Sequence, residues 1–411
     1  MSDDNLKSNI KKPKIFYCSS CLYPSSSAVS LQFDDNLVCS GCITSREKIE
    51  LNWDTTRKEL EILLSQYRDK FNSTYDCIIP VSGGKDSYYQ AHIMKELNMN
   101  ALLVTYNANN YSEEGLENLH NMKEVFGFDH IFFTPAINTL KKLNRLGMLI
   151  MGDMNWHAHC GIFTYPIQVA VNLKIPLMIW GEHGRTDLGG MFSHTDKIEF
   201  TYRERLEHAC RGYEWFDIIK LGEKFGEKLN SKEMGPWIYP NDEQIQKIGV
   251  RGIFLSNYIK WEANEHIELV KKKYGFKESK KEFERTYRKM SNLDDMHENG
   301  IHDYLKFIKF GYGRTSDHGS KDIRANILER SEAIKEVMKR DHIKSKDLKR
   351  WLKYVGWDET TFDKVSDQFR DPRVWWIKDG KWFKQNIDGS ESSYGKVKLE
   401  KKETNRFYKE G

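Results

Sequence analysis

The sequence at residues 76–87 reads Asp-Cys-Ile-Ile-Pro-Val-Ser-Gly-Gly-Lys-Asp-Ser. Its first part, from Cys77 to Val81, is an apolar run typical of a buried strand in a parallel sheet. A Gly-Gly turn follows, and apolar residues four positions apart between 89 and 97 then predict a helix. Strand, turn and helix together predict an anion site, because the N–H groups of the turn converge at the positive end of the helix.

Residues 82–87 supply the side chains that a phosphate site needs. The hydroxyls of Ser82 and Ser87 can donate to phosphate oxygens, Lys85 adds a positive charge, and Asp86 is placed to hold Mg²⁺ or to orient the turn. The order Ser-Gly-Gly-Lys-Asp-Ser differs from the Walker-type loop. It resembles the PP-loop of ATP pyrophosphatases, which cut ATP between the α and β phosphates and adenylate an oxygen of the substrate. The alternative is an ordinary βα turn that happens to be Gly-Gly.

Four apolar runs alternate with helical patterns after residue 75, and this alternation predicts an α/β fold with a doubly wound parallel sheet. The runs are Cys77–Val81, Ala101–Tyr106, His130–Thr134 and Leu177–Gly181. Ligands of such sheets bind at the carboxyl ends of the strands. We expect phosphates at the first loop and adenine and ribose near Tyr106 and Asn107. The predicted nucleotide-binding residues are Ser82, Gly83, Gly84, Lys85, Asp86, Ser87, Tyr106, Asn107, Gly181 and Glu182.

Two further stretches, Met154–Gly161 and Trp180–Gly190, are dense in polar and titratable residues, as site loops often are. The cluster of His157, His159 and Cys160 suits a second metal, a polar wall for substrate or nucleotide, or plain packing. His183 is a general base, a phosphate donor, or a histidine satisfied by neighbouring backbone. The catalytic candidates are Lys85, Asp86, His183 and Cys160, and the candidates for substrate contact in these stretches are His157, His159, Arg185 and Asp187.

Two C-x-x-C pairs, Cys18/Cys21 and Cys39/Cys42, stand seventeen residues apart near the N-terminus. This spacing is typical of a zinc ribbon. Hairpin strands are expected at 31–33 and 36–38, between the pairs. Four thiolates fill a tetrahedral Zn²⁺ and leave no position for water, which predicts a structural zinc. Two redox pairs or chance clustering are the alternatives.

Composition limits the broad class of the protein. At 411 residues the chain can hold two or three domains, and 39% hydrophobic with 30% charged residues fits a soluble protein with a sizeable core. The net charge of +4 is too small to indicate a nucleic-acid partner. Residues 1–14 show no signal peptide, and no apolar run approaches the ~20 residues of a membrane span. We therefore expect a cytoplasmic protein without a membrane segment.

The composition along the chain suggests six parts. They are a mobile leader (1–14), a zinc ribbon (15–45), a helical connector (46–74), a PP-loop ATP pyrophosphatase domain (75–240), a mostly helical substrate or partner domain (241–390) and a basic tail (391–411). Residues 201–235 suggest an insertion over the active site. A loop predicted at 310–322 suits a pocket for a charged or hydroxylated ligand, with Tyr312 and Arg314 as substrate residues, or is simply solvated.

Three stretches narrow the family: His157–Gly161, Trp180–Gly184 and Gly311–Arg314. With the zinc ribbon and the PP-loop, the chain is similar to the N-acetyl sugar amidotransferases of bacterial surface-polysaccharide pathways, including those of lipopolysaccharide O-antigen and of pseudaminic or legionaminic acid. The resemblance implies that an acetamido group on a sugar, expected to be nucleotide-linked, becomes an acetamidino group. ATP would adenylate the amide oxygen with Mg²⁺ as cofactor, and ammonia would displace AMP. No glutaminase triad is visible, so the resemblance implies separate glutaminase and cyclase-like subunits as partners.

Two other readings stay open from the sequence. Some tRNA thiolases combine a zinc ribbon with this loop, but they use two or more cysteines near the active site, and only Cys160 stands in the candidate region. The small net charge is also weak for a protein that neutralises many phosphates. The remaining reading is a zinc-ribbon scaffold that binds nucleotide without catalysis.

Overall fold

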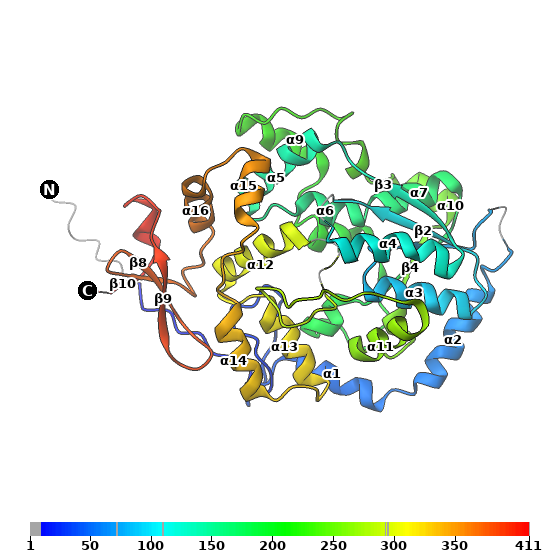
Figure 1. Cartoon of the computed structure of the whole chain (residues 1–411), viewed down its shortest axis with the longest axis horizontal. Coiled ribbons are helices and arrows are strands. Elements are labelled where there is room, and N and C mark those ends of the chain that lie inside the picture. Colours follow the sequence, from blue (N-terminus) through cyan, green and yellow to red (C-terminus); the bar gives the residue numbers. More distant parts are fainter. Residues whose placement is uncertain (1–9, 71–72, 109–110, 292, 294–295, 411) are drawn as a thin grey trace.

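The computed structural model describes residues 10–70, 73–108, 111–291, 293 and 296–410. Its centre is a six-stranded sheet in the order β3-β2-β1-β4-β6-β5 (Figure 1). The strands are β1 (Cys77–Pro80), β2 (Ala101–Tyr106), β3 (Asp129–Phe133), β4 (Leu177–Trp180), β5 (Glu199–Phe200) and β6 (Arg251–Phe254). All neighbours are parallel except β5 and β6. The sheet reverses its winding between β1 and β4, which is where ligands bind in open α/β sheets.

Helices cover both faces of the sheet, as the doubly wound prediction requires. Along β1, Ile79 faces a cluster that includes α3 (Lys85–Glu96), α4 (Glu113–Phe126) and α11 (Ala263–Tyr274). The next residue back, Ile78, faces α7 (Tyr165–Leu173) on the other side. Successive side chains of a strand point to opposite faces, so a strand covered on both sides is apolar throughout. The predicted α/β fold class is thus confirmed.

The sheet extends beyond the predicted boundary at residue 240, which is a correction. β6 lies inside the segment predicted to be mostly helical, and Leu177 of β4 pairs with Arg251 of β6. β5 lies just before the predicted insertion at 201–235 and pairs antiparallel with β6. Both strands are short, at four and two residues. Runs of this length carry little periodicity, so the edge of β4 determines their conformation more than their own sequence does.

The predicted basic tail is folded in part, because Glu391–Lys396 and Lys409–Glu410 are strands of a second sheet. This sheet has the order β10-β7-β8-β9 and stands at the left of Figure 1. Its strands are β7 (Trp376–Lys378), β8 (Lys381–Gln385), β9 (Glu391–Lys396) and β10 (Lys409–Glu410). The lysines after residue 391 are exposed, while Trp382 and Phe407 pack inside with their ring centroids 4.8 Å apart. The prediction of a tail rested on the many lysines of the segment and did not take these few buried aromatic residues into account.

The N-terminal segment contacts the second sheet. Residues 1–9 of the predicted mobile leader lie outside the described residues. Lys12, by contrast, places its ammonium 2.9 Å from Glu391 and 4.4 Å from the ring centre of Trp376. The two ends of the described chain therefore meet at the second sheet.

The remaining helices form the connector, the cover of the sheet and the C-terminal part. They are α1 (Ser40–Glu50), α2 (Trp53–Ser65), α5 (Ile137–Met151), α6 (Trp156–Ile162), α8 (Tyr202–Glu204), α9 (Trp215–Lys224), α10 (Asp242–Ile248), α12 (Met296–Phe310), α13 (Arg314–Arg324), α14 (Arg330–Arg340), α15 (Leu348–Val355) and α16 (Glu359–Gln368), with short turns η2 (Arg185–Gly189), η3 (Arg205–Ala209), η4 (Gly235–Trp237), η5 (Leu255–Asn257) and η6 (Glu403–Arg406). Within the described part of the chain, no helix combines the length and apolar composition that a bilayer span requires.

The predicted loop at 310–322 is mostly helix, since α13 already begins at Arg314. The buried carboxylate of Asp341 caps this helix by accepting hydrogen bonds from the backbone of Gly313 (2.8 Å) and Thr315 (2.9 Å). Capping of this kind satisfies the free N–H groups of a first turn. The cap comes from residue 341, so local sequence did not reveal the helix start.

Candidate functional site

The Ser-Gly-Gly-Lys-Asp-Ser loop connects β1 to α3 as a tight turn. Gly83 has φ +78, and a Cβ there would lie 2.8 Å from the backbone of Leu119, so both conformation and space require glycine. The Ser87 hydroxyl accepts a hydrogen bond from Ser82 N at 2.9 Å, which closes the turn over the first residues of α3. Strand, Gly-Gly turn and helix N-terminus are therefore arranged as an anion site requires.

Two charged side chains stand at the start of α3. Lys85 Nζ lies 2.6 Å from Asp86 Oδ2, and His266 Nδ1 lies 3.7 Å from Asp86 Oδ1. Burial alone would raise the pKa of Asp86, but Lys85 and His266 lower it, so the carboxylate is ionised at neutral pH. Among the described residues, Asp86 Oδ1 is buried and accepts no hydrogen bond. An ionised oxygen of this kind fits a Mg²⁺ ligand.

The loop opens on a cavity of about 290 Å³, here called the loop cavity. Part of its wall comes from the loop itself and part from residues far along the chain. The charged lining residues are Lys85, Asp86, Glu182, Arg288, Arg314, Asp317 and Lys321. The cations outnumber the carboxylates by one, a balance that suits a polyphosphate. Arg288 and Lys321 were not predicted from the sequence, because only the tertiary fold brings them to the loop.

A larger cavity of about 670 Å³, the main chamber, adjoins the loop cavity. The two share Glu182, Leu188, Arg314 and Asp317 as lining residues. Part of the predicted insertion lines the main chamber together with α12, namely Glu204, Arg205, Glu207, His208, Ala209 and Arg211. The two cavities therefore lie side by side and share part of their walls.

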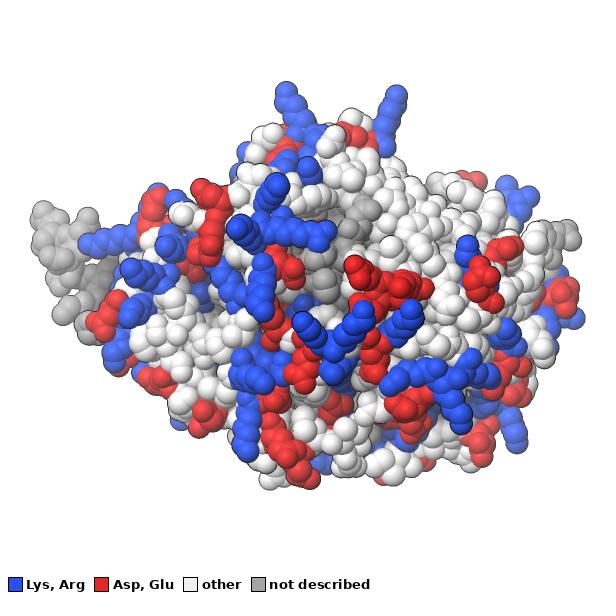
Figure 2. Space-filling view, in the orientation of Figure 1, with Lys and Arg blue, Asp and Glu red and all other residues white. Residues whose placement is uncertain are grey.

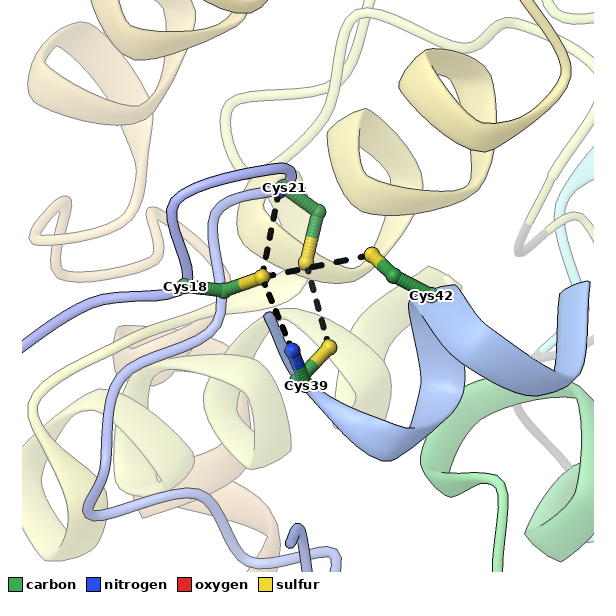
Figure 3. Close-up of side chains that lie close together, drawn as sticks. All are labelled: Cys18, Cys21, Cys39 and Cys42. Carbon is green, nitrogen blue, oxygen red and sulfur yellow. Dashed lines mark hydrogen bonds between the residues drawn. The ribbon is translucent and has the colours of Figure 1, made fainter. Parts of the chain in front are cut away.

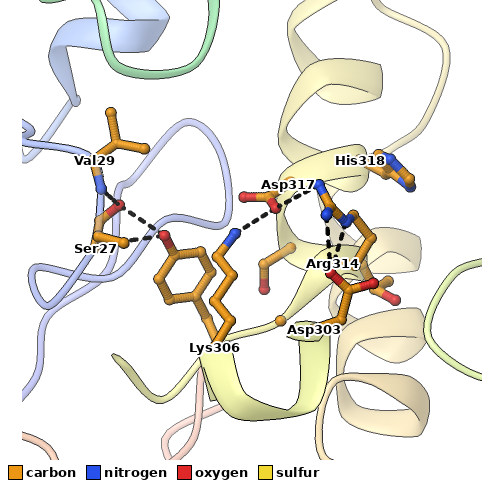
Figure 4. Close-up of polar contacts among 12 residues, drawn as sticks. Ser27, Val29, Asp303, Lys306, Arg314, Asp317 and His318 are labelled. Atoms are coloured by element: carbon orange, nitrogen blue, oxygen red, sulfur yellow. Dashed lines mark hydrogen bonds and ion pairs between the residues drawn. The ribbon is translucent and has the colours of Figure 1, made fainter. Parts of the chain in front are cut away.

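The wall between the two cavities is a network of paired charges (Figure 4). Arg314 donates to Asp303 at 2.9 Å, and Lys306 forms an ion pair with Asp317. Tyr312 lies over Lys306, with 4.4 Å from the ammonium to the ring centre, and its hydroxyl accepts a hydrogen bond from Ala28 N at 3.1 Å. The network fixes the two predicted substrate residues, Tyr312 and Arg314, at the cavity walls.

A second charged group also lines the main chamber. The carboxylate of Asp153 is buried. Its Oδ2 lies 2.9 Å from His302 Nδ1 and 2.5 Å from Arg211 Nη2. Burial lowers the pKa of Lys309 to about 8, with Asp153 opposing the shift. Burial also lowers the pKa of His159 to about 3, helped by His302 and Arg211, so this histidine is neutral at pH 7. The main chamber thus offers both charged and neutral hydrogen-bonding groups.

The structure divides the predicted site residues into two groups. Those that line one of the two cavities are Ser82, Gly84, Lys85, Asp86, His159, Glu182, Arg185, Tyr312 and Arg314. Those that line neither are Gly83, Ser87, Tyr106, Asn107, His157, Cys160, Gly181, His183 and Asp187. Asp187 lines a third cavity of about 360 Å³, the side cavity, where its carboxylate lies 2.5 Å from Lys48.

His183 has both ring nitrogens occupied. Nδ1 lies 2.8 Å from the Thr186 hydroxyl, and Nε2 lies 2.9 Å from Glu204 Oε1. The side chain is buried, and Glu204 stands between it and the main chamber. His183 therefore positions Glu204 and η2 in this structure, a geometry that differs from a base open to substrate.

Of His157, His159 and Cys160, which were predicted as one possible polar wall of the site, only His159 lines the main chamber. His157 is fully buried, with Asn144 at 3.1 Å and the Tyr106 hydroxyl at 3.4 Å. Its role is packing between α5, α6 and β2. The same contact turns Tyr106 into the core, away from the predicted adenine site.

Cys160 does not stand alone, which corrects the sequence reading. Cys210 lies beside Cys160, and Arg205 Nη2 donates a hydrogen bond to Cys160 Sγ at 3.3 Å. Burial alone would raise the pKa of Cys160, but the Cys210 thiol and the Arg205 guanidinium lower it. Both cysteines are fully buried and line neither the loop cavity nor the main chamber. The pair is thus placed for packing and not for sulfur transfer to a bound substrate.

The four N-terminal cysteines converge on one point (Figure 3). Their sulfurs all lie within 4.8 Å of one another, with Cys18 and Cys42 at 4.0 Å and Cys21 and Cys39 at 3.6 Å. A tetrahedral site with zinc–sulfur bonds of about 2.3 Å places its sulfurs about 3.8 Å apart. The cluster therefore fits zinc. The structure has no strands at 31–33 and 36–38, where a hairpin was expected. A single antiparallel bridge between Phe33 and Cys39 takes its place.

Comparison with solved structures finds distant similarity. The NH3-dependent NAD synthetase from Campylobacter jejuni has a TM-score of 0.27 and 11% identity, over 48% of this chain and 92% of that chain. The NMN synthetase from Francisella tularensis has a TM-score of 0.28 and 13% identity, over 55% of this chain and 94% of that chain. Similarity at this level is too distant to inform the reaction.

Two sequence comparisons are more specific. The "Uncharacterized protein MJ1599" of Methanocaldococcus jannaschii is 29% identical over 113 residues. That match covers 27% of this chain and 40% of the relative, so the chain matches less than half of the relative's length. Residues 282–387, which include α12 to α16, β7 and β8, match the model described as "LPS biosynthesis protein WbpG-like, C-terminal domain". The resemblance to a lipopolysaccharide-biosynthesis family is thereby supported, and residues 282–387 are similar to the C-terminal domain of WbpG-like LPS biosynthesis proteins.

Proposed function

We propose that the chain is an ATP-dependent, AMP-forming amidotransferase. It converts an acetamido group of a sugar, itself linked to a nucleotide, into an acetamidino group during synthesis of a bacterial surface polysaccharide. The observation that carries the proposal is the composition of the loop cavity. Lys85 and Asp86 of the loop line it together with Arg288 and Lys321, which belong to the segment that matches the LPS-biosynthesis family.

The chemistry needs an activation step, because an amide oxygen is a poor leaving group. The acetamido oxygen attacks the α-phosphorus of ATP, the new oxygen–phosphorus bond forms, and the bond to the β-phosphate oxygen breaks to release pyrophosphate. Ammonia then attacks the imidate carbon. AMP leaves with the former amide oxygen, and the added nitrogen loses a proton to give the amidine.

The loop would act by positioning and by stabilising charge. Its N–H groups and the Ser82 hydroxyl face phosphate oxygens, and Lys85 neutralises charge that develops on them. Asp86 is the residue that would hold Mg²⁺, which shields the phosphates when bound. Arg288 and Lys321 are placed to stabilise the departing pyrophosphate. They are paired with Asp322 and Glu182 in this structure, so a phosphate would exchange these partners.

The main chamber supports a polar substrate of moderate size. It adjoins the loop cavity and is lined by hydrogen-bonding groups such as His159, Arg185 and Arg314. Pockets of several hundred Å³ are typical of small-molecule sites. A sugar held there would reach the α-phosphate past Glu182 and Leu188, the residues shared by both cavities. Lys and Arg are interspersed with Asp and Glu over the face shown in Figure 2, which also suits a small ligand better than a nucleic acid.

Ammonia must arrive where water is scarce, because water would regenerate the amide. We propose glutaminase and cyclase-like subunits as the source, a partnership that rests on the family resemblance alone. The side cavity offers an entry that a sugar in the main chamber would leave open. It shares Glu182, Arg288 and Lys321 with the loop cavity and has α1 on another side.

The test is a reaction of the purified chain with ATP, Mg²⁺, a high concentration of ammonium and an acetamido nucleotide sugar. The proposal predicts AMP, pyrophosphate and a product one mass unit lighter than the substrate. Asp86→Asn is the control for loop chemistry. A reaction that instead thiolates tRNA, or that forms no AMP with any acetamido sugar, would contradict the proposal.

A further inference from the structure

Arg324, at the end of α13, lies between the cysteine cluster and η2. Its guanidinium donates to Cys42 Sγ at 3.3 Å and to Cys39 Sγ at 3.4 Å. On the other side, Nη1 donates to the carbonyl oxygens of Asp187 at 2.9 Å and Leu188 at 3.1 Å. Nη2 also lies 3.8 Å from Cys21 Sγ, so one side chain joins three of the four thiols to two backbone groups of a turn that borders the cavities.

The surroundings of Arg324 are built to fit a guanidinium. A Cβ on Gly41 would lie 2.4 Å from Arg324 Nη2 and 2.4 Å from Leu188 O, so this position in α1 has room only for glycine. Four thiolates around Zn²⁺ leave a net charge of about −2, and second-shell donors of positive charge stabilise such clusters. A guanidinium has five donors in a fixed plane and can face sulfur on one edge and carbonyl oxygen on the other.

The turn held by Arg324 shapes the active site. Leu188 lines both the loop cavity and the main chamber, and Arg185 of the same turn lines the main chamber. The cysteine-bearing helix α1 adds two contacts to this turn. The Ser40 hydroxyl donates to Gly189 O at 2.6 Å, and Lys48 pairs with Asp187.

We propose that Arg324 is a positioning residue that couples the metal-bound cysteine cluster to η2. With the metal in place the thiolates hold the guanidinium, and the guanidinium holds the carbonyl groups of Asp187 and Leu188. Without the metal the sulfurs separate and the turn loses this support. The zinc module thus sets the shape of the substrate site and does more than stabilise its own fold.

Hydrogen exchange tests this coupling without any enzymatic assay. The amides of Thr186, Asp187 and Gly190 donate hydrogen bonds within the turn, so their exchange reports its opening. The inference predicts that Arg324→Gln keeps one zinc per chain while these amides exchange about tenfold faster. Zinc-stripped wild type should show the same increase, and restored zinc should reverse it.

Arg330→Gln is the matched control. Arg330 also contacts the cysteine module, donating to Cys21 O at 3.0 Å and Cys18 O at 3.1 Å, but among the described residues it donates no hydrogen bond to η2. Exchange at the η2 amides should stay at the wild-type rate in this variant. Unchanged exchange in Arg324→Gln, or equal acceleration in both variants, would overturn the inference. If Arg324→Gln does not fold, Arg324→Lys keeps the charge without the planar fork, and faster exchange is again the expected result.

A kinetic readout rests on the proposed function. Arg324→Gln should raise KM for the acetamido sugar about tenfold and leave KM for ATP within about twofold, because η2 borders the main chamber more than the loop. A wild-type chain without amidine-forming activity would overturn the proposed function alone, since the exchange result does not depend on it. An unchanged sugar KM alongside faster exchange would limit the coupling to the fold and contradict its role in the site.

Discussion

The Lys321 ammonium lies 2.5 Å from the Glu182 carboxylate, and this ion pair stands where the loop cavity meets the side cavity. Glu182 follows β4 of the central sheet, and Lys321 belongs to α13 in the segment that matches the LPS-biosynthesis family. The loop cavity is therefore assembled from both parts of the chain. The C-terminal segment supplies cations that the PP-loop itself lacks.

Replacement of Lys321 by methionine should reduce the rate of AMP formation about 100-fold, the usual effect of removing one group that stabilises charge in the transition state. The surface pair of Lys277 and Glu117, at 2.6 Å, provides the control. Exposed pairs contribute little, so Lys277→Met should keep full activity. Steady-state release of pyrophosphate measures both variants. Equal activity of Lys321→Met and wild type would show that this lysine does not take part in the reaction.

Asp86→Asn should abolish pyrophosphate release while the fold stays intact, because in the proposed reaction the ionised carboxylate would hold Mg²⁺, and it pairs with Lys85. The matched control is Asp54→Asn, since Asp54 is likewise an acidic residue in the first turn of a helix, α2. Circular dichroism checks the fold, and radiolabelled ATP measures turnover. Retained pyrophosphate release in Asp86→Asn would contradict the assignment of the loop.

The cysteine cluster should hold one zinc per chain, and Cys39→Ser should lower both zinc content and thermal stability. Structural zinc sites contribute directly to folding free energy, so a loss of several degrees in Tm is expected. Cys77→Ser is the control, because Cys77 is an equally buried cysteine in β1 outside the cluster. Its zinc content, measured by mass spectrometry, should be unchanged. A zinc-free wild type with the same Tm would argue against a structural metal.

Lys384 predicts a pH dependence of stability. It is 3% exposed, and burial lowers its pKa from 10.5 to about 8, with Asp341 opposing the shift. Between these values the unfolded chain binds more protons than the folded one, so the penalty of burying the charge is complete below about pH 8 and fades toward pH 10.5. The stability gained by Lys384→Met should therefore shrink by about 3 kcal/mol across this window.

Chemical denaturation at a series of pH values measures this difference. The exposed Lys381, on the same strand β8, provides the matched control as Lys381→Met. A stability difference between wild type and Lys384→Met that stays constant from pH 8 to pH 10.5 would show that the ammonium is not destabilised by burial.

The sequence predicted the features that depend on neighbouring residues. The Ser-Gly-Gly-Lys-Asp-Ser loop is a six-residue motif, the four cysteines are recognised by their spacing, and β1, β2 and β4 are largely apolar runs. All three are local signals, and the structure places each of them as expected. The loop and the cluster are thus recognisable before any tertiary contact is known.

The features that the sequence did not reveal depend on distant contacts. Arg288 and Lys321 reach the loop cavity only through the packing of the C-terminal segment. Cys210 meets Cys160 through a buried group that includes Arg205, and α13 begins where Asp341 caps it. Contacts between residues that are tens or hundreds of positions apart leave no periodicity or spacing in the sequence. These parts of the site were therefore found only in the structure.

Transfer of oxygen from substrate to AMP tests the central claim most directly. An acetamido sugar labelled with ¹⁸O in its amide carbonyl is incubated with the chain, ATP, Mg²⁺ and ammonium, and the AMP is analysed by mass spectrometry. If the loop adenylates the amide oxygen, AMP carries one ¹⁸O and the amidine product carries none. Unlabelled AMP, or ADP and phosphate as products, would contradict this account.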